Sequence, residues 1–176
     1  DTRHTGVLLQ RFDIKTPITS YFEHNKIKKL DYILNALAEG DVALVSDAGT
    51  PAINDPGHEL VQAALASHFD VIPVPGPSAS IAALSVSGLP TDSFLYLGYL
   101  PHKKTERRKF ISNVANTTHT LIFFESPHRI MESLEDILSI LGERQICVAR
   151  EMTKMFEEYW RGDISRAIEH FKSQPQ

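Results

Sequence analysis

Short apolar runs alternate with amphipathic stretches along the chain. Apolar residues at helical spacing predict helices over 2–12, 26–38, 57–67, 78–87, 127–141 and 164–171. The stretch 101–109 is expected to be a basic loop that runs into a further helix ending near Ala115. Apolar runs of strand length cover 17–22, 42–46, 71–74, 93–100, 120–124 and 145–149, and 156–160 is typical of an extended segment before a turn at Gly162 and Asp163. Strands that alternate with helices predict an α/β fold with parallel sheet.

Two of these strand-to-helix connections are unusual. The runs 42–46 and 71–74, which have the composition of buried parallel strands, lead into SDAGTPAINDPG and VPGPSAS before a helix begins. Open α/β sheets bind ligands outside the carboxyl ends of their strands, beside helix N-termini. We therefore expect a ligand site at these two loops.

The stretch Gly88–Asp92 interrupts the alternation and is the best linker candidate. It predicts two α/β domains, residues 1–90 and 91–176. A chain of 176 residues with 42% hydrophobic content can bury a core in such domains.

Charge and composition exclude several classes of protein. A formal net charge of −4 argues against a chain that wraps nucleic acid by bulk charge, so any RNA contact has to be local. The single cysteine, Cys147, excludes an internal disulfide framework. No apolar run approaches the roughly 20 residues of a membrane span, and no signal peptide opens the chain, so we expect a cytoplasmic protein without membrane contact.

The acidic loop contains two aspartates with different expected roles. Asp47 follows the strand directly and can accept hydrogen bonds from ribose hydroxyls or an amine; alternatively, it only satisfies loop amides. Gly49 permits close backbone approach or a positive φ, and Pro51 stiffens the loop. Asp55 precedes the helix and is expected to cap it, as Ser78 does in the second loop.

A third loop, in TLIFFESPHR, ends an apolar strand at Glu125 and begins a helix. Arg129 in the first turn of that helix opposes the helix dipole. It therefore has an anionic partner elsewhere, or pairs with Glu132 or Glu125 as a surface bridge of little energetic worth.

The run from His102 to Lys109 holds five Lys or Arg with one acid. It either binds phosphate or is a solvated helix start; the candidate RNA contacts are Lys103, Lys104, Arg107 and Arg108. The eight histidines show no metal-ligand spacing, so no metal is expected. No Walker, GxGxxG or GxSxG motif supports NTP hydrolysis, dinucleotide binding or serine hydrolase chemistry.

Several of these motifs together resemble one family over nearly the whole chain. SDAGTP with the following DPG, VPGPSA, SGLP, YLGYLP, FFESPHR, AREMTK in place of the more usual RELTK, and FEEYWRG are similar to the 16S ribosomal RNA cytidine 2′-O-methyltransferases. These belong to the tetrapyrrole-methylase class of S-adenosylmethionine-dependent enzymes. The resemblance implies two α/β domains of the tetrapyrrole-methylase type with a cofactor cleft between them, and commonly a homodimer. The expected substrate is a cytidine ribose of 16S rRNA in the small ribosomal subunit.

Carried over by motif, the resemblance implies cofactor contacts at Asp47, Ala48, Gly49, Thr50, Pro51, Ser78, Ala79, Glu125 and Arg150. A base, or a cation that stabilises the 2′-oxyanion, is expected among Glu151, Lys154, Arg129 and Arg3. The family's opening strand and its glycine-containing loop are absent before Asp1, as is sequence after the last helix. We therefore expect a fragment of a longer protein. Two alternatives share the scaffold: a tetrapyrrole methyltransferase, and a non-catalytic RNA-binding or nucleotide-binding domain.

Overall fold

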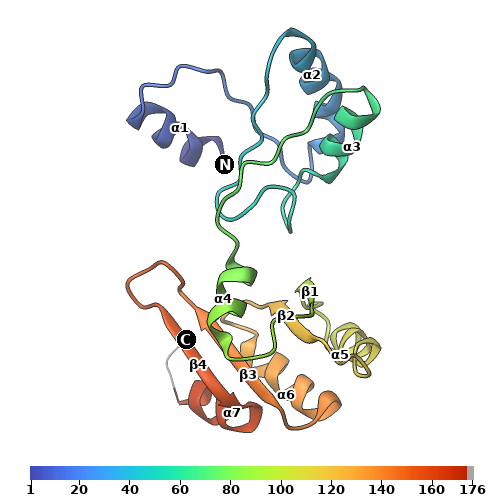
Figure 1. The fold of residues 1–176 in the computed structure, drawn as a ribbon, viewed down its shortest axis with the longest axis vertical. Helices are drawn as coiled ribbons and strands as arrows, with labels where there is room; N and C mark the ends of the chain where they lie inside the picture. Colours follow the sequence, from blue (N-terminus) through green and yellow to red (C-terminus); the bar gives the residue numbers. More distant parts are fainter. Residues whose placement is uncertain (174–176) are drawn as a thin grey trace. The chain divides into compact units, whose positions relative to one another are not determined.

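The structure is a computed structural model that describes residues 1–173. The chain folds as two compact units, residues 1–78 and 79–176 (Figure 1). The domain boundary expected at residue 90 therefore falls inside the second unit, and the helix before that boundary packs with the second unit. Whether the domains of the whole protein meet at residue 90 is not tested by these units, so that boundary stays a prediction.

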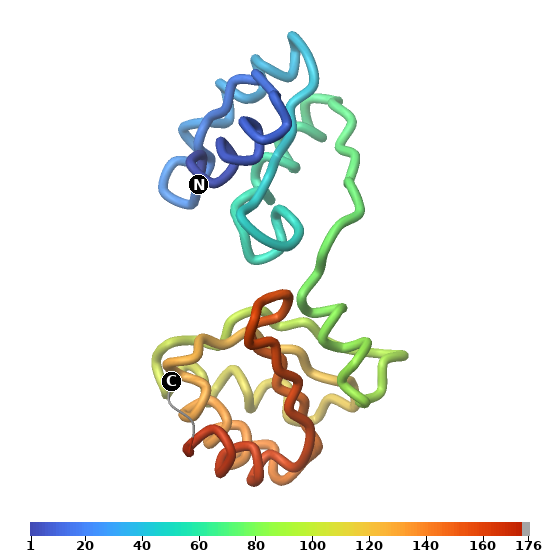
Figure 2. Tube along the Cα trace, turned by 90° about the vertical axis from the view of Figure 1, so that its left-hand side faces the viewer, coloured from blue at the N-terminus to red at the C-terminus, as the bar shows by residue number. Residues whose placement is uncertain are grey.

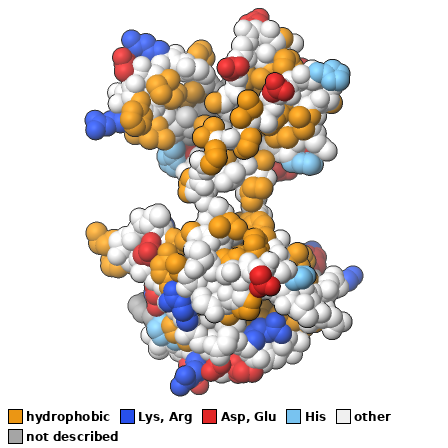
Figure 3. Space-filling model, viewed as in Figure 1, with side chains coloured by type: hydrophobic (Ala, Val, Ile, Leu, Met, Phe, Trp, Pro, Cys, Tyr) orange, Lys and Arg blue, Asp and Glu red, His pale blue; other side chains and the backbone are white. Residues whose placement is uncertain are grey.

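The first unit contains three helices, α1 (Thr2–Arg11), α2 (Lys26–Glu39) and α3 (His58–Ala66), and α2 packs against α3. The expected strands at 17–22, 42–46 and 71–74 are wrong for this unit: none of its residues belongs to a strand. A strand needs a hydrogen-bonded neighbour, and these extended segments have none in the unit. Their apolar side chains stay accessible as a result; Ile72 is 81% exposed and Val74 is 88% exposed. Figure 3 shows hydrophobic side chains spread over the visible face of this unit.

The second unit holds all the strands that the structure describes. Its elements are α4 (Ala79–Ser87), β1 (Phe94–Tyr99), α5 (Lys104–Asn113), β2 (Thr120–Phe124), α6 (Ile130–Leu141), β3 (Gln145–Arg150), β4 (Glu158–Asp163) and α7 (Ile164–Lys172). The expected α/β class is therefore confirmed for the chain. Several boundaries differ from expectation. Helix α5 already begins at Lys104, inside the stretch expected to be a basic loop up to Lys109, and α6 begins at Ile130 rather than at Pro127. The turn expected at Gly162 lies within β4.

The strands form two separate two-stranded sheets. β1 and β2 are parallel, with Phe94 opposite Thr120 and Tyr96 opposite Ile122, and the register shifts between Tyr96 and Tyr99. β3 and β4 are antiparallel, pairing from Gln145 with Asp163 to Arg150 with Glu158. Each of the four strands thus has one paired edge among the described residues.

The core of the second unit lies where α6 and α7 pack on one face of the β3–β4 hairpin (Figures 1 and 2). Four apolar residues form its buried centre: Leu134, Ile164, Ala167 and Phe171. α6 carries apolar residues three and four apart, and these produce its buried stripe. This packing holds the start of α6 beside the end of β2, where the ESPHR motif lies.

Candidate functional site

The acidic loop of the first unit has a constrained backbone. Gly49 has a φ of +69°, in the left-handed region that glycine adopts most easily, and Ala52 and Asn54 also have positive φ. A Cβ on Gly57 would lie 2.8 Å from the Cβ of Ala52 and 3.0 Å from Cδ2 of Leu44. The loop therefore folds back on the segment that precedes it, and only glycine fits at the DPG position.

A hydrogen bond joins the two unusual loops of this unit. The hydroxyl of Thr50 donates to the backbone carbonyl of Pro77 over 3.1 Å, across 27 residues of sequence. Thr50 and its neighbours in the SDAGTP motif therefore lie beside the residue that precedes Ser78. The two loops therefore adjoin, although no sheet holds them.

Asp47 is half exposed, and Nδ1 of His4 lies 3.6 Å from its Oδ1. Its carboxylate is therefore accessible to a ligand. Arg3 pairs with the carboxylate of Asp1 at 2.5 Å and is itself largely exposed.

The capping role expected for Asp55 is wrong. The N-cap of α3 is Gly57, and no side chain caps the helix. Helix α3 begins at His58, after Pro56 and Gly57, so Asp55 lies outside the first turn.

In the second unit, a cavity of about 890 Å³ extends along β2 and β3, with side chains of α4 and α6 contributing to its walls. Strand residues such as Ile122, Ile146 and Val148 give it an apolar interior. Five of the predicted site residues also line it: Ala79, Glu125, Arg150, Glu151 and Lys154. The tertiary structure thus brings together residues from three separate sequence motifs.

Arg150 is held in place by residues that sequence reasoning did not single out. Its Nε donates to Glu158 on β4, and its guanidinium lies 5.7 Å from the centre of the Phe171 ring. Glu158 also contacts Nε2 of His170 at 3.2 Å. Burial by itself raises the pKa of Glu158, but the hydrogen bonds with His170 and Arg150 outweigh it and lower the pKa. This contact could have been predicted only from the register of β3 and β4, which places Arg150 opposite Glu158. The sequence alone does not give that register.

Glu151 and Lys154 lie in the connection between β3 and β4. They form an ion pair of 2.9 Å that is partly open to solvent. Glu151 and Thr153 both have positive φ, which is costly for residues with a side chain and is often found at functional sites. The two candidate catalytic residues therefore occupy a strained segment at the edge of the cavity.

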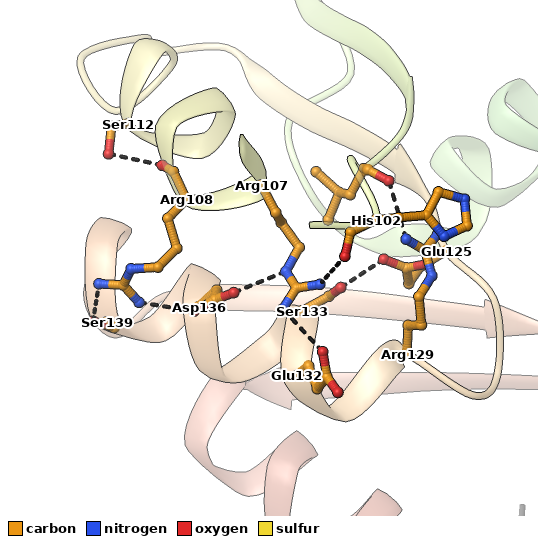
Figure 4. A network of polar contacts seen from close by, with 11 residues as sticks. His102, Arg107, Arg108, Ser112, Glu125, Arg129, Glu132, Ser133, Asp136 and Ser139 are labelled. Atoms are coloured by element: carbon orange, nitrogen blue, oxygen red, sulfur yellow. Dashed lines mark hydrogen bonds and ion pairs between the residues drawn. The ribbon is translucent and has the colours of Figure 1, made fainter. Parts of the chain in front are cut away.

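Figure 4 shows that the basic run is not a uniform surface patch. Arg107 is fully buried; its Nε donates to Asp136 at 2.8 Å and its Nη2 to Glu132 at 3.1 Å. Nη1 of Arg108 donates to the other oxygen of Asp136 at 2.8 Å. The burial of Arg107 removes its guanidinium from contact with RNA, which corrects the expectation for that residue.

The start of α6 holds a second polar cluster. Arg129 donates from Nη2 to Oε1 of Glu125 at 2.6 Å, and both side chains are largely buried. Of the two pairings considered for Arg129, the one with Glu125 is therefore found, and it is an interior contact rather than a surface bridge.

Within residues 1–173, no group of three or more His, Cys, Asp or Glu side chains is arranged to hold a metal ion. Over the same residues, no helix is long and apolar enough to cross a membrane.

Comparison with known proteins places the chain in a family. The family of tetrapyrrole (corrin/porphyrin) methylases matches residues 2–168. Ribosomal RNA small subunit methyltransferase I of Halalkalibacterium halodurans is 49% identical over 169 residues, 96% of this chain and 58% of that protein. The proteins of the same name from Synechocystis and Thermotoga maritima are 48% and 46% identical over 173 residues each. These matches cover 97% and 98% of this chain, and 62% and 78% of the relatives.

The chain belongs to the tetrapyrrole methylase family, in the group whose members are named ribosomal RNA small subunit methyltransferase I. It spans 58% and 62% of the length of the Halalkalibacterium and Synechocystis relatives. The resemblance drawn from the sequence motifs is confirmed at the level of the family.

Proposed function

We propose that the protein to which this chain belongs transfers a methyl group from S-adenosylmethionine to the ribose 2′-hydroxyl of a cytidine in small-subunit ribosomal RNA. The observation that carries the proposal is the family match over residues 2–168, together with relatives named ribosomal RNA methyltransferases at 46–49% identity. We further propose that it works as a homodimer, as the sequence resemblance implies, and that it is cytoplasmic.

The residues of the chain fit the chemistry of S-adenosylmethionine. That molecule carries a sulfonium, an amino group, a carboxylate and an adenosine. In the first unit, Asp47 offers a carboxylate for its amino group or ribose hydroxyls. In the second unit, Arg150 offers a guanidinium for its carboxylate. The positive φ of Gly49 lets a loop backbone approach a ligand closely. When bound, the cofactor supplies the electrophilic methyl group.

The proposed cofactor contacts in the first unit are the SDAGTP and VPGPSA loops. The hydrogen bond from Thr50 to Pro77 supports a common role for them, because it holds Asp47–Pro51 and Ser78 on adjoining segments. In the second unit, Ala79 and Arg150 share a cavity wall, which supports their assignment to one site.

The proposed catalytic group is Glu151 or Lys154. A 2′-hydroxyl must lose its proton as the methyl transfers, and a carboxylate can accept that proton while an ammonium can stabilise the oxyanion. The 2.9 Å ion pair between the two residues places both side chains next to each other. Arg129 is a weaker candidate because its side chain is largely buried against Glu125. Arg3 is exposed and remains a further candidate.

The test uses the full-length protein with small ribosomal subunits that lack the modification and with isotopically labelled S-adenosylmethionine. Label should appear on a single cytidine ribose, located by nuclease digestion and mass spectrometry. A parallel incubation with a tetrapyrrole precursor covers the alternative substrate. Label on the tetrapyrrole and none on RNA would reverse the assignment. No detectable S-adenosylmethionine binding by calorimetry would instead favour a non-catalytic RNA-binding or nucleotide-binding domain.

A further inference from the structure

Glu125 is a buried carboxylate whose oxygens are already engaged. Its side chain is 6% exposed. Oε1 accepts from the amide of Ser126 at 2.7 Å and lies 2.6 Å from Nη2 of Arg129, and Oε2 accepts from the hydroxyl of Ser133 at 2.5 Å. Because an oxygen accepts about two hydrogen bonds, Oε1 has no remaining capacity for a ligand.

Arg129 extends this cluster to the neighbouring strand. Its Nη1 donates to the backbone carbonyl of Leu100 at 3.3 Å, just past the end of β1. Leu100 is itself buried, with 2% exposure. One guanidinium thus joins the ends of the parallel strands β1 and β2 and the first turn of α6 (Figure 4). The contact links the YLGYLP and FFESPHR motifs, which lie 29 residues apart.

These strand ends form part of the cavity wall. Leu100, Glu125, Ser126 and Ser133 all line the cavity. The carboxyl ends of parallel strands are where α/β sheets place their ligands, so a fixed distance between β1 and β2 fixes the shape of a ligand site there.

We propose that Glu125 and Arg129 are a positioning pair that sets this part of the cavity wall, and that neither touches the cofactor or the reacting atoms. The inference rests on the proposed methyltransferase function and deepens it. In this proposal Glu125 is no longer a cofactor contact, and Arg129 is no longer a catalytic candidate, as the sequence had suggested. The pair acts indirectly: Arg129 binds Leu100 at the end of β1, and Glu125 binds Ser133 near the start of α6.

The pair predicts coupled effects of substitution. Removing either charge alone leaves its partner buried without a counter-charge, which destabilises more than removing both. Glu125→Gln and Arg129→Gln are therefore compared with the double variant in the full-length protein. Glu135→Gln, an exposed carboxylate on the same helix, is the matched control.

Four quantities are measured for each variant: the melting temperature, the Kd for S-adenosylmethionine, and kcat and KM with small subunits. Each single variant should lower the melting temperature and reduce kcat by roughly 10- to 100-fold, because displacement of a supporting residue misplaces the site. The cofactor Kd should stay within about threefold of the parent value. The double variant should lose less than the two singles combined in both melting temperature and kcat. Arg129→Lys should partly restore kcat relative to Arg129→Gln, since it keeps the charge beside Glu125.

Three results would overturn the proposal. A Kd raised more than about tenfold by Glu125→Gln, with additive effects of the two positions, would make Glu125 a direct cofactor contact. Lower melting temperatures with unchanged kcat would make the pair a stabilising element alone. A full-length parent protein that neither binds S-adenosylmethionine nor methylates RNA would remove the proposed function itself, and with it the site that the pair would position.

Discussion

Arg107 on α5 and Asp136 on α6 form a buried ion pair, with Nε of the arginine 2.8 Å from Oδ2 of the aspartate. Arg107 is fully buried and Asp136 is 4% exposed. Arg108 binds the second oxygen of Asp136, so one carboxylate anchors two consecutive arginines (Figure 4). The basic run therefore serves in part to attach α5 to α6.

Arg107→Ala should destabilise the protein strongly, because it leaves Asp136 buried with one partner fewer. The expected loss in the free energy of unfolding is about 3–5 kcal/mol. Urea denaturation measures it, with Lys103→Ala as the control. Lys103 is 80% exposed, and its replacement should change stability by no more than about 0.5 kcal/mol. Equal effects of the two substitutions would contradict the interior role of Arg107.

The same aspartate makes stability depend on pH. Burial by itself raises the pKa of Asp136, but the hydrogen bonds from Arg108 and Arg107 outweigh it and lower the pKa below the ordinary value of 3.8. The unfolded state therefore binds the proton more tightly, and stability contributed by this carboxylate is present above pH 3.8 and lost as the pH falls through the lower folded value. Asp136→Asn should lack this component. Urea denaturation of both proteins from neutral to acidic pH should show their difference in stability shrinking at acidic pH; a constant difference would refute the assignment.

Gly57→Ala should destabilise the first unit because the added methyl would lie 2.8 Å from the Cβ of Ala52. Such overpacking costs about 1–3 kcal/mol. Gly40→Ala is a matched control: a Cβ there meets nothing within 4 Å, and the φ of 170° is ordinary extended backbone. Thermal unfolding should separate the two variants, and a similar melting temperature for both would count against the packing of the loop on Leu44.

Asp47→Ala should weaken binding of S-adenosylmethionine more than tenfold, which corresponds to about 1.4 kcal/mol or more. The reason is that a polar group of the bound cofactor would lose its acceptor. Calorimetry on the full-length protein measures the Kd. Asp55→Ala, at another exposed carboxylate of the same loop, should leave the Kd unchanged. If Asp47→Ala also leaves the affinity unchanged, the aspartate is only structural.

Replacing Lys103 and Lys104 by alanine should weaken RNA binding and reduce its dependence on salt, by roughly one unit of slope for each phosphate that the variant no longer binds. Binding of small-subunit RNA at several salt concentrations gives this slope. Lys15→Ala, an exposed lysine of the first unit, serves as the control. The affinity for S-adenosylmethionine should not change. An unaltered slope would show that these lysines do not bind RNA phosphates.

Much of the second unit could be predicted from sequence because its signals are local. The apolar run that forms β2 and the apolar stripe of α6 each arise within one segment, and both elements were predicted close to their observed bounds. The family could be recognised for the same reason, since motifs such as SDAGTP and FFESPHR are read from consecutive residues.

The extended segments of the first unit show where local reading failed. The runs 42–46 and 71–74 are apolar enough for buried strands, yet Val74 is almost fully exposed. Hydrophobic composition reports a preference for burial, whereas a strand also requires a hydrogen-bonded neighbour from a distant part of the sequence. Composition alone does not specify that neighbour.

The sequence by itself determined the order of the helices, the three loops that carry candidate site residues and the membership of a methylase family. Only the tertiary structure decided which charged residues are accessible to a ligand. Arg107 and Lys103 are indistinguishable as members of one basic run, but only Arg107 meets Asp136, 29 residues away, in the interior. Glu125 follows a strand as Asp47 follows an apolar run, yet only Glu125 is buried, among donors from the loop before α6 and from α6 itself. Burial and pairing depend on residues remote in sequence, so their outcome is set when the elements pack.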